Sequence, residues 1–230
     1  MSTNRNPPFY ECQHCSKKLL RKDAFDKHLC EPMRRLALCK TKKGNSAFND
    51  YKYWLNLKKR TVTEFSTFMN SKFFNAFIDF QDFCSSKGIP DKKLFIQQMV
   101  DLDMSPFIWK TDLIYEKYIA YYDVIKTPME MATTTFSTLS KLANILECDI
   151  GDALEHLLPS EISKLIFERR LSPWVLLLSK KFMHYLHMLT DQTQYIMITS
   201  VIDPDEWHKK FKTKPKTVEK IKSLITEFNL

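Results

Sequence analysis

The sequence predicts a mainly α fold: a multi-helix globular body that follows a small N-terminal segment rich in cysteine and basic residues. The chain of 230 residues is 44% hydrophobic and 13% aromatic, which is a globular composition. It contains only three glycines, whereas sheets and phosphate-binding loops depend on glycine for tight turns. Apolar residues at helical spacing and prolines between them add to this evidence and favour helices.

Six prolines mark the starts of expected helices: Pro90, Pro106, Pro128, Pro159, Pro173 and Pro204. Proline is tolerated in the first helical turn, and four of these prolines follow a residue suited to an N-cap, namely Ser105, Thr127, Ser172 and Asp203. Together with the helical spacing of apolar residues, the positions of these prolines predict roughly nine or ten helices after residue 45. The β-compatible run 193–202 is also expected to be helical.

Aromatic residues are expected to form the core. Phe73, Phe77, Phe80 and Cys84 fall at i, i+4, i+7 and i+11, which places them on one helical face. Such a stripe indicates a buried face in preference to a binding surface. No internal repeat of fixed period is evident.

Residues 10–30 contain the clearest motif. Cys12 and Cys15 are separated by two residues, a spacing that lets two thiolates bind one ion, and His28 follows after twelve more residues. Cys30 comes next. The pattern resembles the C2H2-type zinc finger in a CCHC-like form; the resemblance covers residues 10–30 only, and the rest of the chain is unrecognised.

The resemblance implies that Tyr10, Leu19 and Phe25 form a small core, and that Cys12, Cys15 and His28 bind one structural Zn²⁺. The fourth ligand departs from the family pattern. Cys30 follows His28 after a single residue, whereas the family leaves about three to five. The helix must therefore end or tighten near Leu29, and Cys39 is the alternative ligand.

Four protein ligands would close the metal site, so its expected role is structural and not catalytic. Free thiols on a basic helix are the alternative to a metal site. That alternative is disfavoured because so short and polar a segment cannot fold without a metal.

Charge is distributed unevenly along the chain. Residues 1–60 hold 15 Lys/Arg against 5 Asp/Glu, residues 208–230 hold 7 against 2, and residues 61–207 hold 13 against 20. Two basic ends favour a polyanionic partner, the phosphate backbone of DNA or RNA. The expected contacts are Lys17, Lys18, Arg21, Lys22, Lys27, Arg34, Arg35, Lys209, Lys210, Lys212 and Lys214. A solvated basic surface without a ligand is the alternative.

The expected domains are a zinc finger with a basic extension, residues 1–44, and a helical domain, residues 45–230. Within the latter, residues 208–230 are expected to form an extended lysine-rich arm and a last helix. The apolar face of that helix is Val218, Ile221, Ile225 and Phe228.

Two further clusters carry weaker signals. His184 and His187 lie three residues apart and could bind a metal, but no carboxylate completes the set. Glu168, Arg169 and Arg170 lie beside a helix break, where arginines could bind phosphate; local ion pairs are the favoured interpretation. No catalytic residue is predicted.

The expected function is that of a nucleic-acid-binding accessory factor in transcription or replication, not an enzyme, with a protein partner on the acidic region 61–207. A protein–protein adaptor or structural protein without nucleic-acid binding is the alternative, and a DNA-processing enzyme such as a nuclease is the third.

The expected localisation is intracellular. The N-terminus has no apolar core typical of a signal peptide, four of six cysteines cluster near the start, and no apolar run reaches membrane-spanning length. No membrane partner is therefore expected. The high lysine content and the prolines between short helices favour a viral protein, such as one from a tailed phage. The protein would then be located in the cytoplasm of the host cell.

Overall fold

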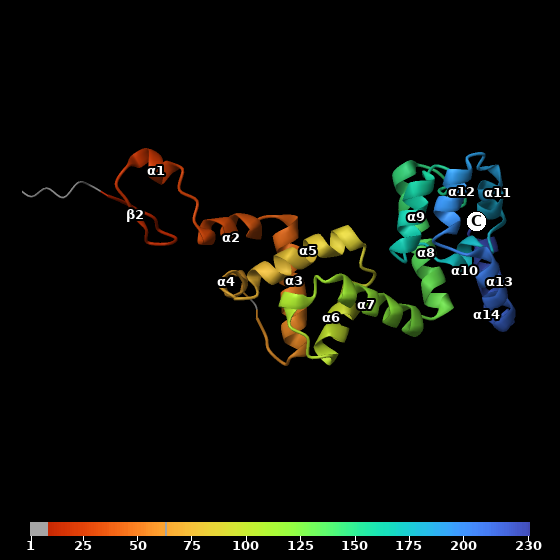
Figure 1. The fold of residues 1–230 in the computed structure, drawn as a ribbon, viewed down its shortest axis with the longest axis horizontal. Coiled ribbons are helices and arrows are strands. Elements are labelled where there is room, and N and C mark those ends of the chain that lie inside the picture. The colour runs from red at the N-terminus through yellow and green to blue at the C-terminus, as the bar shows by residue number, and fades with distance from the viewer. Residues whose placement is uncertain (1–8, 63) are drawn as a thin grey trace, which may run out of the picture. The chain divides into compact units, whose positions relative to one another are not determined.

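The computed structural model describes residues 9–62 and 64–230 and confirms the mainly α fold (Figure 1). The elements of the first part of the chain are β1 (Tyr10–Glu11), β2 (Lys18–Leu19), α1 (Lys22–Asp26), α2 (Glu31–Cys39), α3 (Lys42–Leu57), α4 (Phe65–Met69), α5 (Phe74–Lys87), α6 (Lys92–Asp101) and a 3₁₀ turn (Pro106–Ile108). Those of the second part are α7 (Asp112–Ile125), α8 (Pro128–Leu146), α9 (Pro159–Phe167), α10 (Pro173–Leu176), α11 (Lys180–Met188), α12 (Gln192–Thr199), α13 (Pro204–Thr213) and α14 (Pro215–Glu227).

The described residues contain more and shorter helices than the sequence predicts. Helices also start at caps without proline, such as Ser179 before α11 and Asp191 before α12. Where proline does mark a start, Thr127, Ser172 and Asp203 accept the expected hydrogen bonds from the first turn. The β-compatible run lies largely in α12, so the helical interpretation is confirmed.

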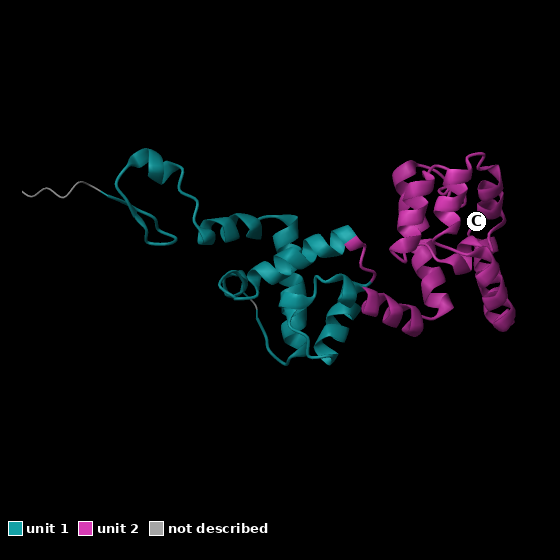
Figure 2. Cartoon of the chain, in the orientation of Figure 1, with its two compact units in different colours: residues 1–86, 91–115 teal, residues 87–90, 116–230 magenta. Residues whose placement is uncertain are grey.

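The chain divides into two compact units (Figure 2). Unit 1 is Met1–Ser86 with Asp91–Tyr115, and unit 2 is Lys87–Pro90 with Glu116–Leu230. This boundary falls inside residues 45–230, the range that the sequence assigns to one helical domain. The sequence also predicts a domain boundary between residues 44 and 45, which means that the helical domain would fold without the zinc finger. This stays a prediction.

The core of unit 1 is aromatic. Phe77 packs edge-on against Trp109 at 5.5 Å and against Tyr51 at 5.4 Å between ring centroids, while Phe80 stacks on Phe95 at 5.2 Å. All five side chains are buried. The rings come from α3, α5, α6 and the segment after the 3₁₀ turn, so contacts between aromatic side chains join helices that lie far apart in the sequence.

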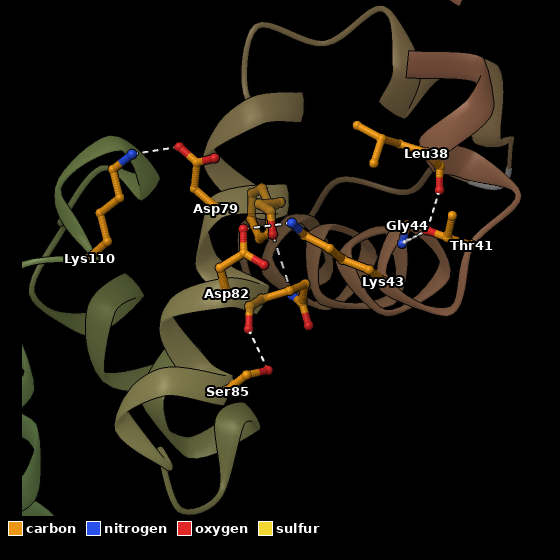
Figure 3. A network of polar contacts seen from close by, with 10 residues as sticks. Leu38, Thr41, Lys43, Gly44, Asp79, Asp82, Ser85 and Lys110 are labelled. Carbon is orange, nitrogen blue, oxygen red and sulfur yellow. Dashed lines mark hydrogen bonds and ion pairs between the residues drawn. The ribbon is translucent and has the colours of Figure 1, made fainter. Parts of the chain in front are cut away.

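The junction between α2 and α3 is tightly built (Figure 3). The Thr41 hydroxyl donates to the Leu38 carbonyl at 2.6 Å and accepts from the Gly44 N–H at 3.0 Å, so one side chain ends α2 and caps α3. A Cβ on Gly44 would lie 2.1 Å from the Leu38 oxygen. Only glycine therefore allows α3 to begin this close to the end of α2.

A half-buried polar cluster holds α3, α5 and α6 together. Lys92 Nζ donates to Ser46 Oγ at 3.0 Å, to Asp50 Oδ2 at 3.0 Å and to Gln81 Oε1 at 2.9 Å. Gln81 in turn donates to Asp50 at 2.8 Å. These bonds satisfy the buried carboxylate and amide, which would otherwise lose their hydration without compensation.

Unit 2 has an aliphatic core. Phe182, Val175, Leu139 and Ile162 are fully buried at its centre, and α9 packs along α12, where Ser163 Oγ donates to the Met197 carbonyl at 3.0 Å. The longest helix, α8, begins at a reciprocal cap between Thr127 and Glu130. In the described part of the chain, no helix combines the length and apolarity that crossing a membrane requires.

The C-terminal region corrects one prediction. Lys209, Lys210 and Lys212 do not lie in an extended arm but on α13, which runs over Pro204–Thr213. Asp203 caps this helix, and the rings of Trp207 and Phe211, four residues apart, pack at a tilt with their centroids 6.0 Å apart. The start at Pro204 and the Asp203 cap agree with the sequence-based expectation, whereas the continuation of the helix through the lysines does not.

The last helix follows the prediction. In α14, Ile221 and Ile225 are buried, and Val218 and Phe228 pack against the same core. Phe228 also stacks on Phe136 of α8 at 4.6 Å. The chain therefore ends in a helix docked on unit 2.

The polar cluster gives a stability prediction. Replacing Asp50 by Ala removes the one carboxylate that accepts from both Lys92 and Gln81, so we expect a loss of about 1–3 kcal/mol in the free energy of unfolding. Asp82, which pairs with Lys43 at 2.6 Å on the surface (Figure 3), provides the control, because Asp82→Ala should cost less than about 1 kcal/mol. Urea unfolding measures both. Equal losses of unfolding free energy in the two variants would show that burial of the polar cluster adds nothing to stability.

Candidate metal centre

The N-terminal hairpin brings the two ends of a short loop together. Strands β1 and β2 are antiparallel, with Tyr10 opposite Leu19. In the loop, the Cys12 carbonyl accepts from the Ser16 N–H at 2.8 Å, and Ser16 has a φ of 55°. This turn is tight enough to hold Cys12 and Cys15 on one side of the hairpin.

Four side chains from 19 residues of sequence converge at this hairpin. The sulfur atoms of Cys12, Cys15 and Cys30 and a ring nitrogen of His28 lie within 4.8 Å of one another. Cys12 Sγ is 3.9 Å from Cys30 Sγ, and Cys15 Sγ is 3.2 Å from His28 Nε2. This Cys₃His group could hold one metal ion.

The spacing of these atoms fits a tetrahedral ion. Zinc–sulfur bonds of about 2.3 Å place two thiolates about 3.8 Å apart in a tetrahedron, close to the 3.9 Å between Cys12 and Cys30. A thiolate and an imidazole nitrogen would lie about 3.6 Å apart, against 3.2 Å for Cys15 and His28. Four protein ligands leave no open position, so the arrangement suits a structural ion.

The surroundings of the hairpin shift the pKa values of Cys12 and Cys15 in opposite directions. The N–H groups of His14 and Cys15 donate to the Cys12 thiol and hold its pKa below the usual value. The Lys17 N–H lowers the pKa of Cys15, but loss of solvent and the neighbouring Cys12 and Cys30 thiols outweigh it and raise that pKa above the usual value. A divalent cation among the thiols would remove this mutual repulsion.

The helix of the finger ends and tightens before Leu29, in line with the sequence-based expectation. The regular helix α1 stops at Asp26, and the His28 N–H bonds to the carbonyl three residues earlier, that of Phe25, at 3.0 Å. Both His28 and Cys30 therefore lie outside a regular helix, which removes the conflict posed by their short spacing. The predicted contact between Tyr10 and Phe25 is present, with ring centroids 5.6 Å apart.

The structure favours Cys30 over Cys39 as the fourth ligand. Cys30 is the N-cap residue of α2 and belongs to the cluster, whereas Cys39 lies at the last position of α2, outside it. Cys84 is packed in unit 1, where burial raises the pKa of its thiol to about 12. Such a thiol stays protonated and is a poor nucleophile at neutral pH.

The predicted phosphate contacts of the finger are mostly exposed. Lys17, Lys22 and Lys27 are solvent-accessible, as is Arg34 on α2. Two others have acidic neighbours on the surface: Arg21 pairs with Asp23, and Lys18 lies 4.0 Å from Glu11. Exposed pairs of this kind contribute little, so they leave these cations able to bind other anions.

Arg35 has a different environment from Arg34. Its guanidinium donates to Glu31 at 3.0 Å and to the Met69 carbonyl at 2.9 Å, and it lies over the Phe74 ring at 5.1 Å. These contacts attach α2 to α4 and α5. Of the predicted phosphate ligands, Arg35 is therefore the one whose side chain already serves the fold.

The second predicted set lies in unit 2, separate from the finger. Lys209, Lys210, Lys212 and Lys214 are all exposed. Lys209 pairs with Glu206 at 2.7 Å, and Lys210 Nζ lies 4.4 Å from the centre of the Trp207 ring. The structure thus distributes the predicted contacts over two units.

The two weaker clusters have simpler explanations. His184 and His187 are exposed on α11, outside the metal-compatible group found among the described residues. Glu168 lies 3.6 Å from Arg170 and 3.9 Å from Lys164, and Arg169 pairs with Asp123 at 2.9 Å. Local ion pairs, the favoured interpretation, are therefore present.

A pocket in unit 2 was not evident from the sequence. It is lined by Lys126, Arg169, Trp174, Trp207 and Lys210, among others. These residues belong to four separate segments, and no spacing rule connects them.

No protein-family model matches the chain, and comparisons with curated proteins and with solved structures find no match either. The resemblance to a zinc finger rests on ligand spacing and on the convergence of the four side chains.

The choice of ligands can be tested by elemental analysis of purified protein. Cys30→Ser should lose most of the bound metal, because it removes one of four clustered donors. Cys39→Ser is the matched control and should retain about one metal ion per chain. Loss of metal from the Cys39 variant with retention in the Cys30 variant would assign the fourth ligand to Cys39.

Proposed function

We propose that this protein is a nucleic-acid-binding accessory factor whose finger is held by one structural Zn²⁺ and binds phosphates with its basic surface. The observation that carries the proposal is the Cys₃His cluster, surrounded by exposed lysines and arginines. The proposed role is binding and not catalysis, within an intracellular process such as transcription or replication.

Zinc is the metal that suits this donor set. Thiolates and imidazole favour zinc over magnesium, calcium and manganese, which prefer oxygen ligands. A bound ion would cross-link the hairpin to the segment after α1. Cys12 is the one buried ligand, and Tyr10 and Phe25 supply the finger's aromatic contact. So small an apolar core supports the view that the fold of the finger depends on the metal.

The chemistry of the basic residues favours phosphate contacts over base recognition. Lysine is a flexible point charge suited to phosphate, and phosphate contacts orient a protein without specifying sequence. A single finger reads about 3 bp. We therefore propose sequence-tolerant binding, with Lys17, Lys18, Arg21, Lys22, Lys27 and Arg34 on the finger, and Lys209, Lys210, Lys212 and Lys214 in unit 2.

A protein–protein adaptor is the second candidate, and a surface of α12 favours it. Tyr195, Ile196 and Met197 are 40%, 53% and 39% exposed, and they follow one another in the acidic region. Successive residues of a helix point in different directions, so these three side chains leave apolar surface exposed over a wide part of α12, and exposed apolar surface can serve for partner contacts. The two roles are compatible, because an accessory factor would use this surface for its protein partner and the finger for nucleic acid.

Salt dependence tests the nucleic-acid proposal. With about four to six phosphate contacts, the logarithm of the binding constant for duplex DNA should fall against the logarithm of salt with a slope of about −4 to −5. Replacing Lys17, Lys18, Arg21 and Lys22 by Ala should make the slope shallower by about one unit for each phosphate that the variant no longer neutralises. Fluorescence anisotropy at several salt concentrations measures both.

A charge-matched variant is the control. Lys117, Lys141, Lys164 and Lys180 are also exposed but lie outside the predicted set, so their joint replacement by Ala should leave the slope unchanged. Elemental analysis should show that both variants retain zinc. Absence of binding to duplex and single strands at about 50 mM salt, where such contacts are strong, would exclude the nucleic-acid role and leave the adaptor.

A further inference from the structure

A pocket of about 340 Å³ lies within unit 2. This volume is at the lower end of the range of about 300–1,000 Å³ that small-molecule sites occupy. Residues from α7, α8, α9, α10 and α13 contribute to its wall, together with the connections between them. A ligand of that size would be a single small unit and not an extended cofactor.

Cations dominate the charged part of the lining. Lys126, Arg169, Lys210 and Lys214 line the pocket, against the single carboxylate of Asp123. Lys210 and Lys214 are exposed, and Lys214 has no ion-pair partner among residues 9–62 and 64–230. Arg169 pairs with Asp123 and Lys126 lies 3.8 Å from Glu130, so the positive charge left for an anion in the pocket comes mainly from Lys210 and Lys214.

The same pocket has aromatic walls. Trp174 and Trp207 both line it, and their rings pack edge-on at 5.5 Å. Phe211 supports both, at 5.2 Å from Trp174 and 6.0 Å from Trp207. Trp174 is buried, whereas Trp207 is half-buried. Lys210 Nζ lies 4.4 Å from the Trp207 ring centre, so one cation and one indole are adjacent in the lining.

Arg169 is held at the pocket by contacts that fix its guanidinium. Its Nε and NH2 atoms donate to the Asp123 carboxylate at 3.2 and 2.9 Å, and its NH1 donates to the Phe167 carbonyl at 2.9 Å. The backbone of Arg169 has a φ of 57°, a left-handed conformation that ordinary side chains seldom adopt. Arg169 directly follows Glu168, the C-cap residue of α9, where a left-handed residue commonly ends a helix.

We propose that this pocket binds a nucleotide, with its phosphate at the lysines and its base against Trp207, which Trp174 supports from below the surface. Aromatic stacking suits every base, and lysine and arginine suit phosphate. The ligand would be either a free mononucleotide or one unit of a single strand, since both present the same base and phosphate. This inference goes beyond the proposed function, because the pocket would bind a nucleotide whether or not the finger binds a polymer.

Titration of the full-length protein with dTMP, thymidine and inorganic phosphate, followed by calorimetry, tests the inference. The protein should bind dTMP at least about tenfold more tightly than either fragment, because only dTMP supplies both halves of the interaction. No saturation by about 1 mM dTMP, or equal binding of phosphate alone, would overturn the proposal.

Variants locate the site. Lys214→Ala should weaken dTMP binding by about tenfold, since it removes a charge-assisted hydrogen bond to the phosphate, and Trp207→Leu should do the same by removing the stacking surface. Lys216→Ala is the matched control: this lysine is exposed and lies two residues further on, outside the lining. If Trp207→Leu fails to fold, Lys210→Ala takes its place. Equal affinities for the Lys214 and Lys216 variants would overturn the assignment.

Comparing dTMP with a short oligo(dT) distinguishes a free mononucleotide from one unit of a single strand. A variant of the finger distinguishes the pocket proposal from the proposed function of the finger. If the ligand is a single strand, a short oligo(dT) should bind more tightly than dTMP, and dTMP should compete with it. If the ligand is free nucleotide, dTMP should bind at least as tightly as the oligonucleotide. Replacement of Lys17, Lys18, Arg21 and Lys22 by Ala should weaken polymer binding alone. Loss of dTMP binding in that variant would contradict a separate site in unit 2.

Discussion

The short helices of this protein are stable only when their ends are capped and their apolar faces are covered by other parts of the chain. An isolated helix needs about 12–15 residues to be even marginally stable, whereas α4 has 5, α10 has 4 and α11 has 9. The caps at Ser172, Ser179 and Asp203 and the covered aromatic faces therefore determine where each helix forms. The finger is the extreme case, because its five-residue helix buries no side chain and needs a different cross-link.

Sequence reasoning succeeds where a local rule governs the structure. The convergence of Cys12, Cys15 and His28 as candidate ligands follows from spacing, and the start of α8 follows from Thr127 before proline. It fails where contacts between distant segments decide. The sequence predicts the start of α13 at Pro204 but not its continuation to Thr213. Trp207 and Phe211 of this helix pack against Trp174, which is 33 residues before the nearer of them, and no local pattern in a lysine-rich run reveals such a contact.

The number of charged residues in a region does not show which of them are free to bind a ligand, as Arg34 and Arg35 illustrate. The two residues are adjacent and chemically identical, yet Arg34 is exposed while Arg35 bonds to the Met69 carbonyl and covers the Phe74 ring. Sequence gives the net charge of a region but not which cations the fold uses. Lys92, held by Ser46, Asp50 and Gln81, is another cation that contributes to the fold instead of to the surface field.

The finger and the pocket, the two proposed sites, would recognise different features of a nucleic acid. Lysines and arginines on the finger would meet phosphates, which every nucleic acid presents alike. The pocket would take a base against Trp207, and a base paired and stacked inside a duplex cannot enter a space of about 340 Å³ without leaving the helix. Unstacking costs least in a single strand. Taken together, the proposed finger and the proposed pocket would favour single-stranded nucleic acid over duplex while remaining tolerant of sequence.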